Sequence, residues 1–260
     1  MKAVIATKYG GPEVVAIVER PTPAVGPRDV LIAVRAASLN PLDYKIRDGK
    51  TKLVLPLKVP IALGCDVAGV VVAIGAEVTK FAVNDEVYAR LEKLRMGGLA
   101  EQVAADESVV ALKPTTLSFE EAASLPLAGL TSLQALRGLQ PGQRVLVHAG
   151  AGGVGTLAIQ IAKILGLVVV TTTSTKNVAF VTSLGADEVI DYTKENVEDR
   201  PRALDAVFDT LGADSEVTSI RATKRGGVVV GVGGLPDGAF AATWMPASIF
   251  AGLRSSSENH

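Results

Sequence analysis

The chain is poor in cysteine, in net charge and in long apolar runs. Its 260 residues contain one cysteine, Cys65, which excludes internal disulfide bonds and is typical of proteins from a reducing compartment. The formal net charge of −1 provides no basic surface field, so neither nucleic acid nor an anionic membrane is expected as a partner. No apolar run approaches the roughly 18–20 residues that span a bilayer, and no secretory or transit signal precedes the first strand pattern. We therefore expect a cytoplasmic protein without a membrane span.

The chain is rich in apolar residues, at 48%, and they gather in short segments between glycines. Such segments suit strands that are buried on both faces, and the length allows one large or two modest domains. Up to about residue 112, short strand patterns alternate with turn residues, which indicates an all-β, barrel-like unit. These strand patterns cover residues 2–7, 14–19, 29–36, 66–74, 86–89 and 98–104.

The pattern changes in the second half of the chain. A capping box from Ser118 to Glu121 opens a predicted helix over 120–125. Strands are then predicted at 144–148, 168–173, 187–191, 204–208 and 227–232, and helices at 154–165, 176–184 and 214–224. This alternation is the βαβ pattern of a parallel, doubly wound sheet. We therefore predict an α/β chain with a barrel-like domain over 1–117 and a Rossmann-type domain over 118–260.

The segment VLVHAGAGGVG at 145–155 is the most informative in the chain. It places a short apolar strand before three spaced glycines and a helical run after them, as in dinucleotide-binding turns. Gly150 permits a tight turn, Gly152 lets the backbone approach a pyrophosphate, and Gly155 allows close helix–strand packing. The N–H groups and positive dipole end of the helix would then face the phosphates. The alternatives are a glycine-rich turn without a ligand, or one that holds a flavin or S-adenosylmethionine.

The loop after the second strand of this domain indicates which nicotinamide cofactor is preferred. NAD sites place an acid about 20 residues after the glycine motif, on the ribose 2′-OH. Here no acid occurs before Asp187, whereas Ser174 and Lys176 offer a hydroxyl and a cation for a 2′-phosphate. The same loop can also cap the next helix with Lys176 in solvent, which does not conflict with binding. We predict NADP(H) as the cofactor.

Several segments together resemble the zinc-free medium-chain dehydrogenase/reductases, and within them the quinone oxidoreductase-like enone and alkenal reductases. The resemblance rests on KAV at 2–4, NPLDYKIR at 40–47, GCDVAG at 64–69, FAVNDEVY at 81–88, GLAE at 98–101, AASLPL at 122–127 and the glycine segment, and LGAD at 184–187 and IDYTKEN at 190–196 extend it. It covers essentially residues 1–235 in order. It implies a GroES-like barrel that carries the substrate site, then a Rossmann domain, with the cofactor in the cleft between them.

The resemblance also implies which residues form the site. The implied cofactor contacts are Lys45, Thr131, Gly150, Gly152, Gly153, Val154, Gly155, Ser174, Thr175, Lys176, Asn177, Tyr192, Leu211 and Gly231. We assign Lys45 to cofactor positioning and to stabilisation of the developing oxyanion, with the proton coming from Tyr44 or water. Without the resemblance, Lys45 would be interpreted as a solvated helix residue. Asp43 and Arg47 are expected to form structural polar contacts.

Metal ligands are missing at the positions where zinc-dependent members of the family hold theirs. A catalytic zinc takes about three protein ligands of the Cys, His or Glu type, and the matching positions carry Asn40 and the pair Cys65-Asp66. The histidines are His148, interpreted as the end of its strand, and His260. We therefore predict no metal, which excludes a zinc alcohol dehydrogenase. Cys65 is interpreted as a small buried hydrophobe, with a thiol at the active-site wall as the alternative.

The predicted function is an NADPH-dependent reductase that transfers hydride, without metal, to the activated C=C of an enone or alkenal, or to a quinone. The resulting enolate or hydroquinone anion needs a nearby donor rather than a strong Lewis acid. The expected partner is a small apolar enone or quinone substrate. The alternative is a non-catalytic, crystallin-like NADPH-binding protein, and the near-neutral charge speaks against a role in RNA binding.

The chain departs from the family at its end. Members of the family continue with a last Rossmann strand and with strands that return to complete the barrel, whereas no returning strand pair is predicted after residue 232. Either the chain is truncated, so that the usual C-terminal segment is missing, or the barrel closes differently through a second subunit. We expect a homodimer. Phe240, Trp244 and Phe250 would line a pocket or cover the exposed sheet edge.

Overall fold

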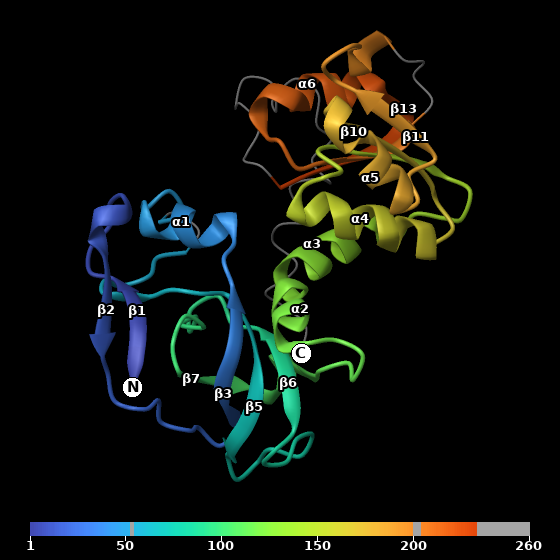
Figure 1. Ribbon diagram of the computed structural model, residues 1–260. Helices are drawn as coiled ribbons and strands as arrows, with labels where there is room; N and C mark the ends of the chain where they lie inside the picture. Colours follow the sequence, from blue (N-terminus) through green and yellow to red (C-terminus); the bar gives the residue numbers. More distant parts are fainter. Residues whose placement is uncertain (53–54, 200–203, 233–260) are drawn as a thin grey trace. The chain divides into compact units, whose positions relative to one another are not determined.

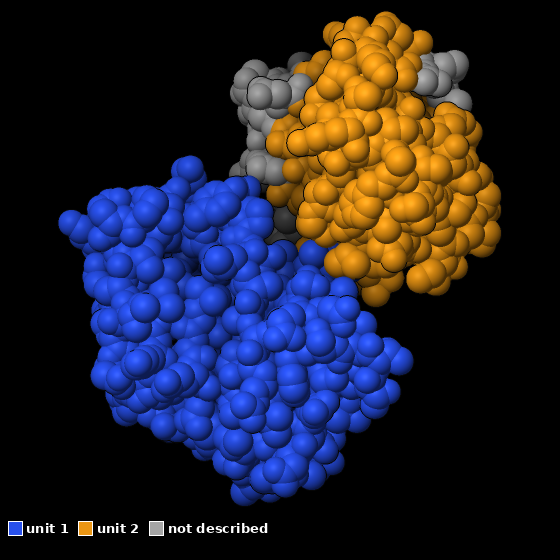
Figure 2. Space-filling view, viewed as in Figure 1, with its two compact units in different colours: residues 1–130 blue, residues 131–260 orange. Residues whose placement is uncertain are grey.

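The computed structural model describes residues 1–52, 55–199 and 204–232, and the chain divides into two compact units, residues 1–130 and 131–260 (Figures 1 and 2). The domain boundary at 117/118 stays a prediction. Helix α2 (Phe119–Ser124), just after that boundary, belongs to unit 1 and packs through Ala122 and Ala123 against Ala68. Within the described residues no helix is long and apolar enough to cross a membrane.

Unit 1 is built from two antiparallel sheets, in line with the all-β prediction (Figure 1). The smaller has the order β2-β1-β4, and the larger the order β7-β3-β5-β6-β8. The strands are β1 (Lys2–Ala6), β2 (Val15–Glu19), β3 (Asp29–Ser38), β4 (Ile61–Ala62), β5 (Asp66–Ile74), β6 (Glu86–Arg90), β7 (Gln102–Asp106) and β8 (Val110–Leu112). Helix α1 (Pro41–Arg47) lies between β3 and β4 in the sequence.

The core of the larger sheet follows the period of two that a strand imposes. Val30 and Ile32 on β3 and Val67 and Val71 on β5 are fully buried, and Val87 on β6 joins them. Alternate residues of a strand point to the same face, so these side chains form one apolar layer. Burial of such a valine or isoleucine contributes about 1.5–3 kcal/mol.

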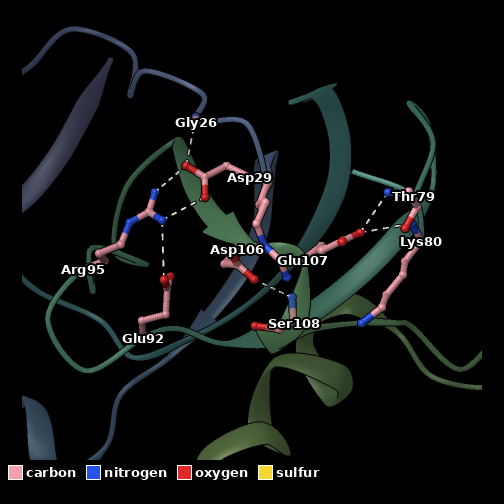
Figure 3. Close-up of polar contacts among 10 residues, drawn as sticks. Gly26, Asp29, Thr79, Lys80, Glu92, Arg95, Asp106, Glu107 and Ser108 are labelled. Carbon is pink, nitrogen blue, oxygen red and sulfur yellow. Dashed lines mark hydrogen bonds and ion pairs between the residues drawn. The ribbon is translucent and has the colours of Figure 1, made fainter. Parts of the chain in front are cut away.

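Ion pairs and N–H···carboxylate bonds fix the connections at one end of this sheet (Figure 3). Asp29 accepts two hydrogen bonds from the guanidinium of Arg95, at 2.8 and 2.6 Å. Glu107 accepts from the backbone N–H groups of Thr79 and Lys80, at 3.0 and 3.1 Å. Because backbone donors in a loop have no ladder partner, Glu107 satisfies two N–H groups that would otherwise depend on water.

Unit 2 carries a five-stranded sheet in the order β11-β10-β9-β12-β13, with every pairing parallel (Figure 1). Numbered within the unit, this is the order 3-2-1-4-5 that characterises a Rossmann sheet, so the doubly wound prediction is confirmed. The strands are β9 (Arg144–Val147), β10 (Val168–Thr173), β11 (Glu188–Asp191), β12 (Leu204–Asp209) and β13 (Thr223–Gly231). The helices are α3 (Pro126–Leu136), which begins in unit 1, α4 (Gly153–Ile164), α5 (Val178–Ser183) and α6 (Ala213–Ala222).

Helix α4 shows why this sheet forms a layer with its helices. Its buried residues Gly155, Ala158, Ile159 and Ala162 recur at helical spacing, so one stripe of the helix faces the sheet. The sheet presents Val145 and Val147 of β9 to the same cluster, both fully buried.

Some elements differ from the sequence prediction. Helix α3 and the short strands β4 and β8 were not predicted, and β13 begins at Thr223, four residues before the predicted strand. The segment after residue 232, with Phe240, Trp244 and Phe250, lies outside the described residues. The prediction about how the barrel is completed therefore stays a prediction.

Candidate functional site

The cofactor residues predicted for unit 2 gather at one edge of its sheet. The glycine loop follows β9, Ser174, Thr175, Lys176 and Asn177 follow β10, Tyr192 follows β11, Leu211 follows β12, and Gly231 ends β13. Only Thr131 lies elsewhere, on α3. Open parallel sheets bind ligands outside the carboxyl ends of their strands, at the point where the strand order reverses. Here that point lies between β9 and β12.

Two glycines of the loop are required by close packing. A β-carbon on Gly155 would lie 2.3 Å from the carbonyl oxygen of Ala149, and one on Gly150 would lie 2.0 Å from Oγ1 of Thr171. No real β-carbon approaches another atom this closely. The loop therefore lies tightly on α4 and β10; the sequence predicted close packing for Gly155 and a tight turn at Gly150.

The other two glycines leave the start of α4 open. Gly152 is the N-cap residue and offers no capping side chain, and a β-carbon on Gly153 would have no atom within 4 Å. The first N–H groups of a helix have no partner within the helix, and the dipole adds positive potential at this end. An uncapped helix start with free space beside it is suited to a phosphate. Val154, in the same turn, is partly buried.

A buried polar cluster lies directly beneath this loop, and the sequence analysis missed it. His148, Thr172, Asp209 and Ser219 are all buried, and they come from the ends of β9, β10 and β12 and from α6. Burial lowers the pKa of His148. Burial alone would raise the pKa of Asp209, but hydrogen bonds, first from Ser215 and Ser219, lower it. His148 is thus more than the end of its strand.

The loop after β10 has an acidic neighbour that a search along the sequence did not find. Oγ1 of Thr175 donates to Oδ2 of Asp191 at 2.5 Å, and Asp191 ends the adjacent strand β11. The bonds from Thr175 and Thr193 lower the pKa of Asp191. Ser174 is the N-cap of a short 3-10 helix but makes no side-chain capping bond, and Lys176 is exposed. The hydroxyl of Thr175 is therefore engaged within the unit, whereas the side chain of Lys176 is open to solvent.

The remaining residues predicted for unit 2 are accessible. Tyr192 is 61% exposed and Leu211 is 59% exposed. Gly231 is exposed and Thr131 partly buried. A cavity of about 320 Å³ lies between the end of α3 and strands β9, β12 and β13, but none of the predicted residues lines it.

Helix α1 carries the two residues predicted to act on the substrate. Asn40 is its N-cap, Pro41 occupies the first turn, and the Asp43 side chain accepts from the Asn40 N–H at 2.7 Å. Tyr44 is exposed and Lys45 is partly buried. As predicted, Asp43 makes structural contacts, because its other oxygen accepts from the N–H of Gly64 at 3.2 Å.

Arg47 also matches the structural role predicted for it, since its guanidinium binds Asp48 at 2.7 Å. The described residues hold no group of three or more His, Cys, Asp or Glu side chains that could bind a metal ion.

Cys65 and Asp66 occupy positions that hold zinc ligands in the zinc-dependent members of the family, but their surroundings here are different. Cys65 is fully buried in an apolar cluster, and burial raises the pKa of its thiol, which fits the interpretation as a small hydrophobe. Asp66 is also fully buried, and its Oδ2 accepts from the Asn40 side chain at 3.0 Å and from the Leu127 N–H at 3.1 Å. Burial raises the pKa of Asp66, whose Oδ1 has no hydrogen-bond partner among the described residues.

Comparison with known proteins identifies the family of both units. Residues 26–115 match the alcohol dehydrogenase GroES-like domain, and residues 153–254 match the zinc-binding dehydrogenase family. The 2-methylene-furan-3-one reductase of Solanum lycopersicum is 44% identical over 88% of this chain, and the chloroplastic NADPH-dependent alkenal/one oxidoreductase of Arabidopsis thaliana is 43% identical over 90%. The chain spans only 61% and 63% of the lengths of these relatives.

A solved structure agrees with both domain matches. The quinone oxidoreductase from Coxiella burnetii superposes with a TM-score of 0.84 at 40% identity, over 93% of this chain and 78% of that one. The predicted combination of a GroES-like domain and a Rossmann sheet is thereby confirmed. The chain belongs to the medium-chain dehydrogenase/reductase family, and within it to the quinone oxidoreductase type.

Proposed function

We propose that this chain binds NADPH on unit 2 and reduces the activated C=C of an enone or alkenal, or a quinone. The observation that carries the proposal is the start of α4. There, Gly152 leaves the helix uncapped and Gly153 leaves free space beside it, at the point where the strand order reverses. A group with two adjacent phosphates fits this arrangement.

The cofactor would be held along the carboxyl ends of the strands. The N–H groups at the start of α4 would bind the pyrophosphate, and the exposed side chains of Tyr192 and Leu211 would contact the rest of the molecule. When bound, NADPH supplies a hydride. The chain's own residues bind the cofactor, orient the substrate and stabilise the negative charge that develops on it.

The preference for NADPH over NADH rests on the loop after β10. Lys176 is exposed there, and Ser174 makes no side-chain capping bond, so both can meet a 2′-phosphate. The hydroxyl of Thr175 is already bound to Asp191. We therefore assign Thr175 to shaping the loop, and Asn177 with it, because the Asn177 side chain donates to Oγ of Ser174 at 3.5 Å. The sequence analysis gave both residues cofactor contacts, and we now propose Ser174 and Lys176 for these contacts.

Lys45 and Tyr44 are proposed to act on the substrate. Lys45 would stabilise the developing oxyanion through its positive charge, and the exposed phenol of Tyr44 or a water would deliver the proton. The names of the tomato and Arabidopsis relatives, a methylene-furanone reductase and an alkenal/one oxidoreductase, support an activated C=C as the reacting group.

Three further statements belong to the proposal. We propose that no metal takes part, that two copies form a homodimer, and that the protein is cytoplasmic. Elemental analysis, light scattering after gel filtration, and fractionation of cells that express the chain test these statements in turn.

Binding measurements on the isolated protein test the cofactor assignment. We expect wild type to bind NADPH more tightly than NADH, and Lys176→Ala combined with Ser174→Ala to weaken NADPH by about 10²–10³-fold. Ser174→Asp should repel NADPH and offer NADH a ribose acceptor. Arg225→Ala removes an exposed cation from the start of β13 and serves as the control. Equal wild-type affinity for the two cofactors, or an unchanged ratio in the variants, would contradict the assignment.

A further inference from the structure

The buried cluster beneath the glycine loop forms a continuous chain of hydrogen bonds. Oγ1 of Thr172 lies 3.0 Å from the N–H nitrogen of Ala149 and 3.3 Å from Nδ1 of His148. Nε2 of His148 lies 3.2 Å from Oγ of Ser219, which lies 2.7 Å from Oδ2 of Asp209. This hydrogen-bond chain thus runs from the backbone of the glycine loop to the carboxylate of Asp209.

Counting hydrogens fixes the direction of each bond in this chain. The Thr172 hydroxyl accepts from the Ala149 N–H, so its own hydrogen is available for Nδ1 of His148. An imidazole that accepts at Nδ1 carries its hydrogen on Nε2, and it donates that hydrogen to Ser219. Ser219 then donates to Asp209. A charged His148 would donate from Nδ1 as well and leave the Thr172 hydrogen without an acceptor among these groups, so only the neutral ring uses every donor, which agrees with the lowered pKa that burial gives it.

The two ends of this hydrogen-bond chain hold two different segments of the proposed cofactor site. At one end lies the glycine loop, where the Gly150 N–H also binds the Thr172 carbonyl at 2.9 Å. At the other end, Oδ1 of Asp209 accepts from the Leu211 N–H at 2.9 Å and from the Gly212 N–H at 3.2 Å. These segments follow β9 and β12, the strands on either side of the point where the order reverses.

We propose that Thr172, His148, Ser219 and Asp209 are positioning residues that hold the glycine loop and the Leu211 turn in register for the dinucleotide. The inference rests on the proposed function and deepens it. None of these buried side chains needs to touch the cofactor. Each acts through backbone that does, so that the loop is already in its binding conformation before the ligand arrives.

Near-isosteric removal of single hydroxyls tests the proposal. We expect Thr172→Val and Ser219→Ala each to raise the NADPH dissociation constant about five- to tenfold, the equivalent of one net hydrogen bond. Thr172→Ser, which keeps the hydroxyl, should restore most of the affinity. Thr182→Val, which removes a hydroxyl that bonds within α5, should leave it unchanged. Melting temperatures measured in parallel confirm that each variant is folded at the temperature of the titration.

A double mutant distinguishes one connected chain from separate local effects. Both hydroxyls act through the same imidazole, so Thr172→Val/Ser219→Ala should weaken NADPH little more than the stronger single variant. If the losses in NADPH binding free energy are additive, the two residues act independently, and the proposal of one connected hydrogen-bond chain is wrong.

Nitrogen NMR of the His148 imidazole tests the hydrogen-bond chain without a substitution in any of its members. The chain has two histidines, so His260→Ala leaves one imidazole signal. We expect a neutral ring with its hydrogen on Nε2 at pH 7. A charged ring, or the hydrogen on Nδ1, would overturn the assignment.

The outcomes separate this inference from the proposed function. If wild type binds NADPH and both hydroxyl variants bind it equally well, the positioning role is wrong and the proposed function stands. If wild type does not bind NADPH, both are wrong.

Discussion

The carbonyl oxygen of Ala149 and the α-carbon of Gly155 lie so close that a β-carbon on Gly155 would be 2.3 Å from the oxygen. Ala149 itself has a left-handed backbone, with a φ of 51°. The first turn of α4 and the loop before it therefore pack backbone against backbone. This contact defines the shape of the site that we assign to the cofactor.

The contact predicts opposite effects for alanine at two neighbouring glycines. Gly155→Ala should lower the free energy of unfolding by about 1–3 kcal/mol, because the new methyl group has no room. Gly153→Ala should leave it unchanged or raise it by up to about 1 kcal/mol, because the methyl group enters open space and alanine favours a helix. Urea unfolding of both variants checks this, and equal effects would mean that the close approach is not real.

Gly153→Asp separates binding from folding at the same position. The side chain has room, and a carboxylate at a helix N-terminus stabilises the helix. It would also place negative charge where the pyrophosphate is proposed to bind, so NADPH binding should be lost while the unfolding curve hardly moves. Gly153→Ala is the matched control, and calorimetry gives the affinities. Wild-type affinity in Gly153→Asp would remove the start of α4 from the site.

Lys45→Ala tests the residue proposed to stabilise the oxyanion. We expect kcat for enone reduction to fall by about 10²-fold, because an aligned charge is lost at the developing anion. The free energy of unfolding should change little, since Lys45 is only partly buried. The control is Lys50→Ala, which removes a nearby exposed lysine. Wild-type kcat and kcat/KM in Lys45→Ala would mean that Lys45 does not stabilise the oxyanion and is only a solvated helix residue.

The stability of unit 1 in acid should depend on Asp106. Hydrogen bonds from Ser108, with a smaller effect of Arg28, lower the pKa of Asp106 to about 2 from an ordinary value of 3.8 (Figure 3). A carboxyl whose pKa is lower in the folded state stabilises the fold above its unfolded pKa, and this stability is lost as the pH falls through the folded value. The loss should therefore fall between about pH 4 and pH 2.

Urea unfolding of Asp106→Asn as a function of pH checks this dependence. The free energy of unfolding of the variant should decline less steeply than that of wild type between about pH 4 and pH 2. Parallel curves for the two proteins would show that Asp106 does not titrate as its contacts require.

Local patterns account for the parts of the fold and site that could be predicted from the sequence. The glycine loop is one continuous segment, and its function as a turn depends on neighbours within a few residues, such as Ala149 and Gly155. The strands of the parallel sheet are buried on both faces, so their apolar runs stand out.

Contacts between distant segments could not be predicted in the same way. His148 meets Ser219 across 71 positions of sequence, and Leu127 donates to Asp66 across 61. No periodicity links such pairs, because the topology of the sheets brings them together. The same holds for Thr175 and Asp191, whose contact depends on β10 and β11 being neighbours. The place of Asp191 beside the loop after β10 therefore could not be predicted from its position in the sequence.

Turnover of NADPH tests the central claim most directly. The purified chain is mixed with NADPH and, in turn, an enone, an alkenal and a quinone, and the absorbance of NADPH is followed with and without a chelator. We predict protein-dependent oxidation of NADPH with at least one of these acceptors, slower oxidation of NADH, and no effect of the chelator. Tight binding of NADPH without turnover of any acceptor would contradict the reductase and leave a protein that only binds the cofactor.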